Sequence, residues 1–283
     1  MHRIILRLLV HGCVAASIAA VPALADSISL APSKDNSLYQ VVAVNPALPS
    51  HGQLSNGLGD VFVGRTNQDG QGPATISIRR GLLAFVIAGS IPAGAIVTSA
   101  SLTMRDVMGL NGDRSVELRR TSADWGEGTT FFNGGQGAPA SEGDVTWFYR
   151  FFNAANPTAS PAWTNPGGDF SLTASASSVV SDDLGVGQLF TWSSVGNPLM
   201  LADVQNWLDN PAANFGWTMV GVETAGQTAK RFNSGESTAS PNVPPVLTIE
   251  YTLIPEPGSL ALAAVAITAW IGTSRSRRCS AAL

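Results

Sequence analysis

Hydrophobic and polar residues alternate along much of this chain in short runs, and Gly, Pro, Ser, Thr, Asn and Asp interrupt these runs at short intervals. Within residues 115–120, Val116 and Leu118 fall on one side of an extended chain, and Glu117 and Arg119 fall on the other. A period of two with one apolar side is typical of half-buried antiparallel strands. The chain as a whole therefore predicts an all-β fold, either a sandwich or a barrel.

The strand predictions cover most of the middle of the chain. They comprise residues 39–44, 60–65, 74–80, 81–87, 95–107, 115–121, 144–151, 169–174, 188–193, 215–222 and 245–253. In the last of these segments Leu247, Ile249 and Tyr251 form the apolar side. We expect one antiparallel domain over residues 26–252, since about 230 residues are enough to build a packed core.

One helix is predicted to interrupt this pattern, within residues 196–211. Asn197 is placed to cap it, and Pro198 suits its first position. An apolar side follows at helical spacing, made by Leu201, Val204 and Leu208. We expect this short helix to cover one end of the β domain.

The first 25 residues have the layout of a secretory signal peptide. Arg3 and Arg7 give a basic start, an apolar stretch follows, and Ala23 and Ala25 supply the small residues of a cleavage site. The apolar stretch is short for a membrane span and runs directly into that cleavage pattern. The sequence thus predicts export through the secretory pathway, with cleavage after Ala25.

A second apolar run, residues 258–272, lies near the other end of the chain. Alanine and leucine cover every side of it, and a basic tail with Arg275, Arg277 and Arg278 follows. A helix of this length rises about 22 Å, and flanking residues would extend it toward the ~30 Å hydrocarbon core. We expect a transmembrane helix whose arginines stay on the cytoplasmic side, which leaves the β domain outside.

Pro255, Glu256 and Pro257 stand directly before this apolar run. The order of a Pro-Glu-Pro motif, a short span and a basic end resembles the PEP-CTERM sorting signal of Gram-negative bacteria, here over residues 253–283. The resemblance implies that an exosortase recognises the membrane-anchored intermediate, after which the protein is released or transferred to the outer surface in bacteria rich in exopolysaccharide. A plain membrane anchor is the alternative that the same span and charges satisfy.

Composition narrows the chemistry of the exported part. The chain of 283 residues is 45% hydrophobic and only 13% charged, and residues 26–254 hold 11 Lys and Arg against 19 Asp and Glu. This acidic balance argues against nucleic acid as a partner. Beyond the signal peptide the chain has one cysteine, Cys279, and one histidine, His51. Disulfides and cysteine chemistry are therefore excluded from the β domain, and His51, in a Pro/Gly-rich loop, is expected to be solvated.

Several segments together resemble DNRLRE domains, a family of secreted β-sandwich modules related to carbohydrate-binding modules. The segments that carry the resemblance are residues 35–40, 54–68, 78–104, 116–130 and 214–252. The chain departs from the family pattern at residues 84–86, which read Ala-Phe-Val in place of Arg-Phe-Asp, and at Gly235, where the family commonly has Arg before Glu. The resemblance implies a jelly-roll-like sandwich and attachment to polysaccharide or to a cell-surface matrix.

Sugar binding requires flat apolar side chains for the C–H groups of the ring and polar groups for its hydroxyls. Trp125 and Trp163 lie in turn-rich stretches, with Asp124 and Glu127 beside the first of them. We take these four residues as a candidate glycan platform. The alternative is that each of these two Trp residues packs as a lid on one end of the fold. The Trp residues within the strand and helix patterns are expected in the core.

Two further candidate sites rest on oxygen-bearing side chains. Asp106, Asn111 and Asp113 surround a turn and carry ligands that calcium accepts, although the spacing is not that of an EF-hand and Asx-turn hydrogen bonds explain the same residues. The carboxylates Asp124, Glu127, Glu142 and Asp144 could act as an acid and base pair of a glycosidase. No catalytic residue is assigned, because abundant carboxylates on an acidic surface are usually solvated, and no cofactor other than calcium is expected.

The sequence thus predicts an exported, non-enzymatic, surface-sorted protein that binds exopolysaccharide in an extracellular matrix. One alternative is a structural surface protein without a specific ligand. The other is a polysaccharide hydrolase or lyase that acts through Asp or Glu.

Overall fold

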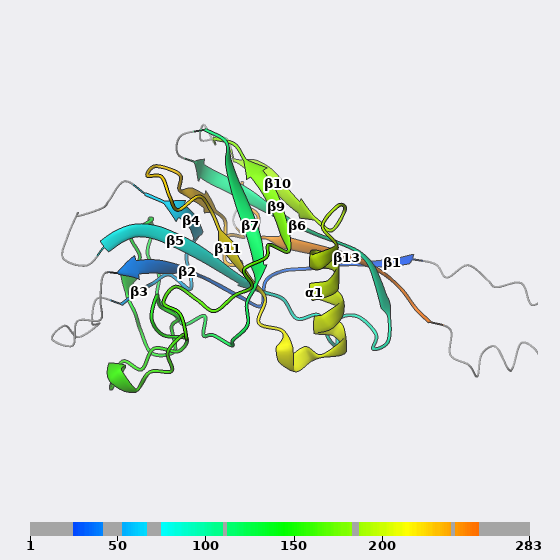
Figure 1. The fold of residues 1–283 in the computed structure, drawn as a ribbon, viewed down its shortest axis with the longest axis horizontal. Helices are drawn as coiled ribbons and strands as arrows, with labels where there is room; N and C mark the ends of the chain where they lie inside the picture. Colours follow the sequence, from blue (N-terminus) through cyan, green and yellow to red (C-terminus); the bar gives the residue numbers. More distant parts are fainter. Residues whose placement is uncertain are drawn as a thin grey trace, which may run out of the picture.

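The computed structural model describes residues 25–41, 53–66, 75–109, 112–182, 187–238 and 241–254. The protein is mostly β, with an antiparallel sheet that curls into a half-barrel and one short helix (Figure 1). The predicted signal peptide, except its last residue, and the sorting motif with the apolar run and basic tail lie outside the described residues.

All strand pairs of the curled sheet are antiparallel. Its strands are β1 (Ala25–Leu30), β2 (Lys34–Val41), β4 (Val61–Arg65), β5 (Thr75–Ala84), β6 (Ile96–Gly109), β7 (Arg114–Arg120), β9 (Ala176–Val180), β10 (Gln188–Ser193), β11 (Trp217–Val220), β12 (Lys230–Phe232) and β13 (Val246–Thr252). They are ordered β1-β13-β6-β12-β4-β5-β11-β7-β9, with β10 added on β6 and β2 on β5. A separate small pair joins β3 (Leu54–Ser55) to β8 (Ala138–Pro139).

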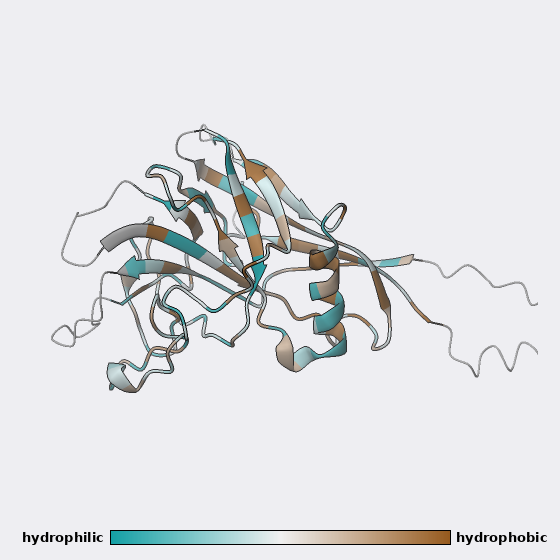
Figure 2. Ribbon diagram, in the orientation of Figure 1, coloured by the Kyte–Doolittle hydropathy of each residue, from teal (hydrophilic) through white to brown (hydrophobic). Residues whose placement is uncertain are grey.

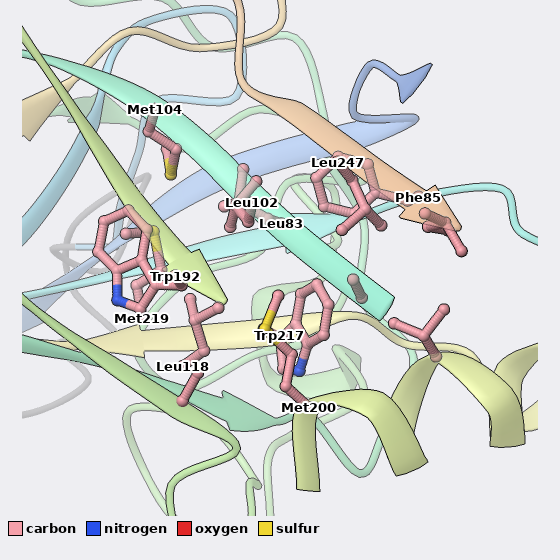
Figure 3. Close-up of a cluster of buried hydrophobic side chains, with 14 of the residues drawn as sticks. Leu83, Phe85, Leu102, Met104, Leu118, Trp192, Met200, Trp217, Met219 and Leu247 are labelled. Carbon is pink, nitrogen blue, oxygen red and sulfur yellow. The ribbon is translucent and has the colours of Figure 1, made fainter. Parts of the chain in front are cut away.

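The curl of the sheet encloses the larger hydrophobic core. Side chains from β6 and β13, such as Leu102 and Leu247, meet side chains from β5, β7 and β11, such as Leu83, Leu118 and Trp217 (Figure 3). Apolar and polar residues alternate along several strands (Figure 2), so one side of each strand enters this interior. The alternation predicted for β7 and β13 is confirmed, with the apolar residues of each strand buried or half-buried.

The predicted helix is confirmed as α1 (Pro198–Asp209), which packs on β6 and covers one end of the core. Trp207 contacts Trp217 edge to face, with ring centroids 4.6 Å apart. Asn197 is the N-cap residue as predicted, but its side chain makes no capping hydrogen bond, because its amide donates to the carbonyl of Ser193 in the preceding strand. Two short 3₁₀ helices complete the regular elements: η1 (Pro157–Ala159) and η2 (Pro211–Ala213).

The predicted strands at 144–151 and 169–174 are wrong. These residues belong to the long connection from β7 to β9, which lies beside β2 and β5 in Figure 1. Trp147 of this connection packs with Leu38 of β2 and Leu82 of β5 in a second hydrophobic cluster. The apolar residues that resembled a strand are therefore buried by an irregular loop.

The first and last described strands lie side by side. In β1 and β13, Ala25 is paired with Thr252 and Leu30 with Leu247. The two ends of the described domain therefore leave it at the same place (Figure 1). In the part of the chain that the structure describes, no helix has the length and hydrophobicity needed to cross a membrane.

Candidate functional site

The predicted glycan platform is wrong in its aromatic part. Trp125 is 1% exposed and Trp163 is 5% exposed, so neither ring offers a flat face to a sugar. Both belong to the second hydrophobic cluster, and their indole N–H groups donate to the carbonyls of Phe215 and Thr146. The alternative interpretation, that these Trp residues act as packed lids, describes them better.

The four carboxylates considered for acid and base chemistry have separate roles. Asp124 forms an ion pair with Lys34, with 2.7 Å between Oδ1 and Nζ. Glu142 accepts the backbone N–H of Ala154. Asp144 is fully buried and accepts hydrogen bonds from backbone and hydroxyl donors of the surrounding loop. Of the four, only Glu127 belongs to a group of carboxylates with metal-binding geometry.

The calcium ligands predicted at the turn after β6 stay a prediction. Asp106 is buried in β6 and its carboxylate accepts the backbone N–H of Met108, whereas Asp113 is exposed. Asn111 lies outside the described residues, as does His51.

A group of three carboxylates forms where distant parts of the chain meet. Asp35 comes from β2, Glu127 from the loop after β7, and Glu236 from the turn after β12. One oxygen from each carboxylate lies within 4.8 Å of an oxygen of each of the others. Asp35 is buried, Glu127 is half-buried and Glu236 is exposed, so the group runs from the interior to the surface. We call these three residues the acidic cluster.

Backbone hydrogen bonds hold the acidic cluster together. The N–H of Asp35 donates to Oε1 of Glu127 over 2.8 Å, and the N–H of Gly235 donates to Oδ2 of Asp35 over 2.7 Å. Burial raises the pKa of Asp35 well above its ordinary value, and the nearby Glu236 raises it further. Burial likewise raises the pKa of Glu127. The protein therefore does not fully compensate the negative charge that it gathers here.

A hollow of about 200 Å³ opens beside the acidic cluster and shares Glu236 with it. Its wall combines the turn before β4, the loop after β7, and β12 with the turn that follows. The lining residues are Leu58, Gly59, Asp60, Phe131, Phe132, Asn133, Arg231, Ser234, Glu236 and Ser237. We call this space the aromatic hollow, because Phe131 and Phe132 are 62% and 37% exposed.

Polar side chains fix one wall of the aromatic hollow. Nε of Arg231 donates to Asp60 over 2.5 Å, and Nη2 donates to the side-chain oxygen of Asn133 over 3.2 Å. The hydroxyl of Ser237 also donates to Asp60. A backbone hydrogen bond from Phe132 to the side chain of Asn56 anchors the aromatic pair. The hollow thus sets exposed aromatic carbon beside preorganised donors and acceptors.

The sequence interpretation missed both of these features for different reasons. Phe131 and Phe132 directly precede a glycine-rich stretch, and two consecutive aromatic residues at such a place are a local signal that one ring is exposed. The acidic cluster has no local signal, because Asp35 and Glu236 are far apart in the chain and become neighbours only when β2 and β12 enter the same sheet.

No protein-family model matches this chain, and no curated protein is similar to it at a significant level.

Proposed function

We propose that the protein is an exported, surface-sorted, non-catalytic module that binds exopolysaccharide through the aromatic hollow. The observation that carries this proposal is the exposed pair Phe131 and Phe132 beside Arg231 and Asn133. The proposal includes the finer fold that the DNRLRE resemblance implies, with the curled sheet as the frame of a jelly-roll-like sandwich.

The chemistry of the hollow suits a sugar better than an apolar ligand. Aromatic rings contact the C–H groups of a pyranose, while the Arg231 guanidinium and the Asn133 amide can meet its hydroxyls. The hollow is smaller than the ~300 Å³ at which pockets for drug-sized ligands begin, which fits one sugar unit of a chain. Arg231 is also held in place by Asp60 and Asn133, so binding requires little reorganisation.

Retention of the protein in polysaccharide-containing gels tests this function. Exopolysaccharide from Gram-negative biofilms, alginate and a neutral glucan serve as probes. We expect Phe131→Ala to lose at least about tenfold in affinity, because such a residue at the centre of a binding site typically contributes more than 1.4 kcal/mol. Leu189→Ala is the matched control, since Leu189 of β10 is also 62% exposed but does not line the hollow.

If none of the probes retains the wild type or Phe131→Ala, the structural surface protein without a specific ligand becomes the better proposal. Equal retention of the wild type and Phe131→Ala would remove the hollow as the binding site.

The sorting part of the proposal rests on the sequence patterns of the two ends. It is supported by the pairing of β1 with β13, because both ends of the domain then face the same membrane during processing. Intact-mass measurement on the exported protein tests it. We expect a mature chain that begins at Asp26 and lacks the basic tail, and retention of the tail in the double variant Pro255→Ala and Pro257→Ala. A wild-type protein that keeps the tail would indicate a plain anchor.

A polysaccharide hydrolase is the second candidate, because one observation favours it. Glu127 combines a raised pKa with a close neighbour, Asp35, and pairs of this kind act as acid and base in glycosidases. Release of reducing ends or unsaturated sugars, lost in Glu127→Gln, would favour the enzyme over the binding module.

A further inference from the structure

The acidic cluster gathers three carboxylates without a cationic partner from the protein. In the described ranges, no Lys or Arg nitrogen lies within ion-pair distance of Asp35, Glu127 or Glu236. Lys34 acts on Glu127 only through its electrostatic field, and its ammonium group is already bound to Asp124 and to the carbonyl of Trp125. Basic side chains of the described residues therefore do not neutralise the negative charge of the cluster.

A second observation points to a ligand. Asp35 is 1% exposed, and its Oδ1 has no hydrogen-bond partner among the described residues. The other oxygen, Oδ2, accepts the N–H of Gly235. An anionic oxygen that is removed from water and given no donor is costly, so a buried carboxylate of this kind needs a proton or a bound cation. The carboxylate is directed at the cluster, because it has an oxygen within 4.8 Å of oxygens of both glutamates.

The donor set decides which cation fits. All three side chains offer carboxylate oxygens, which hard cations prefer, and the cluster has no nitrogen or sulfur ligand of the kind that selects zinc. Calcium binds oxygens at 2.3–2.6 Å, so two oxygens on one ion can be up to about 5 Å apart. The separations in the acidic cluster fall inside this limit.

We propose that Asp35, Glu127 and Glu236 bind one calcium ion. The ion neutralises the three carboxylates, gives Oδ1 of Asp35 its partner, and fixes the turn that carries Glu236 against β2. Water supplies the remaining ligands on the exposed side, where Glu236 reaches the surface. This proposal does not rest on polysaccharide binding, although the same turn lines the aromatic hollow.

The experiment uses the full chain after treatment with a chelator, titrated with calcium chloride and separately with magnesium chloride in a calorimeter. We expect calcium to bind with a dissociation constant on the order of 10⁻⁴–10⁻³ M, as in other extracellular modules. At 100 times that concentration, we expect the melting temperature to rise by roughly 5–10 °C. Magnesium should bind at least about tenfold more weakly, because it demands a tighter octahedral site.

Glu236→Gln is the test variant, since its exposed side chain can be changed without disturbing the fold. We expect it to bind calcium at least about tenfold more weakly and to lose the thermal shift, while without calcium it melts no lower than the wild type because a like charge is gone. Glu250→Gln is the control, because Glu250 is an exposed acid of β13 outside the cluster and should leave both readouts unchanged.

Three results would each overturn the proposal. The first is the absence of both heat and a thermal shift up to about 20 mM calcium, which is well above the expected dissociation constant. The second is a wild-type calcium affinity in Glu236→Gln. The third is an equal affinity of the wild type for calcium and for magnesium. Polysaccharide retention is measured separately in chelator, so that a loss of calcium binding and a loss of glycan binding are distinguished.

Discussion

Two buried aspartates, Asp35 in strand β2 and Asp144 in the loop after β7, show how differently one fold can treat the same side chain. Asp144 is fully buried, yet both of its oxygens have donors: the backbone N–H groups of Thr129 and Ser141, at 2.8 and 2.7 Å, and the hydroxyl of Thr130. Asp35 is equally buried, but one oxygen has a single donor, the other has none, and two glutamates lie close by. Donors stabilise a buried anion, whereas carboxylates around it destabilise it.

This difference separates a carboxylate that holds a loop from one that is prepared for a ligand. The loop packs tightly around the carboxylate of Asp144. Residue 128, with φ +77°, lies so close to it that only glycine fits there. A Cβ at this position would lie 1.5 Å from Oδ1 of Asp144. No such enclosure is needed at Asp35, where the cluster opens toward the surface through Glu236. We therefore expect the two aspartates to respond in opposite directions to the same substitution.

The largest effect is expected from Asp144→Asn. The amide group places donors where the loop already presents N–H and O–H donors, and the charge that strengthens the hydrogen bonds is lost. We expect the free energy of unfolding to fall by about 2–4 kcal/mol, measured by urea denaturation. A loss below about 0.5 kcal/mol, as at ordinary surface positions, would show that the loop does not depend on this carboxylate.

Asp35→Asn is expected to act in the opposite sense when calcium is absent. Removing the charge relieves the repulsion from Glu127 and Glu236, while the remaining amide oxygen can still accept the N–H of Gly235. We expect the free energy of unfolding to rise by about 1 kcal/mol near neutral pH. In saturating calcium the order should reverse, because the variant has lost a ligand.

The effect of the Asp35 charge should also appear in the pH dependence of the free energy of unfolding. A carboxylate whose pKa is raised on folding binds a proton more tightly in the folded than in the unfolded protein. The calcium-free wild type should therefore lose stability as the pH rises from the ordinary Asp pKa through the raised value. Because Asp35→Asn lacks this contribution, the two curves should converge at low pH and separate above it. If Asp35→Asn is instead less stable than the wild type at every pH, the Asp35 carboxylate stabilises the fold as that of Asp144 does.

The sequence reveals the parts of the fold that depend on local periodicity. The strands β7 and β13 and the helix α1 follow from their alternating or helical apolar positions, since each buries one side in the larger hydrophobic core. Strands β9 and β12 are not predictable in this way. The first is rich in Ser, the second has three residues, and both depend on neighbours from elsewhere in the chain.

The same distinction applies to the candidate sites. Sequence alone groups Asp124, Glu127, Glu142 and Asp144 because they are close in the chain. Three of these residues nevertheless bind separate partners: Asp124 pairs with Lys34 of β2, and Glu142 and Asp144 accept backbone N–H groups of the loop. The group that does form joins Glu127 to Asp35 and Glu236 through strand pairing over long sequence separations. Burial, which distinguishes Asp35 from an ordinary surface acid, is likewise decided by tertiary packing.

The smallest effect is expected from Lys34→Gln, which probes the edge of the acidic cluster rather than its centre. Lys34 pairs with Asp124 at a partly exposed position, and its ammonium group lies 4.5 Å from the centre of the Trp125 ring. Solvent screens such a pair, so we expect a loss of about 0.5–1 kcal/mol, reduced at high salt.

The substitution should also change how Glu127 titrates. Burial raises the pKa of Glu127, and Lys34 partly offsets that rise. Without Lys34 the pKa should rise further, which nuclear magnetic resonance of the Glu127 carboxyl carbon would detect, and stability should fall more steeply with pH than in the calcium-free wild type. If Lys34→Gln instead leaves the Glu127 titration unchanged, the Lys34 ammonium group interacts electrostatically with Asp124 and not with Glu127. The cluster would then have even less compensation for its charge than the comparison with Asp144 assumes.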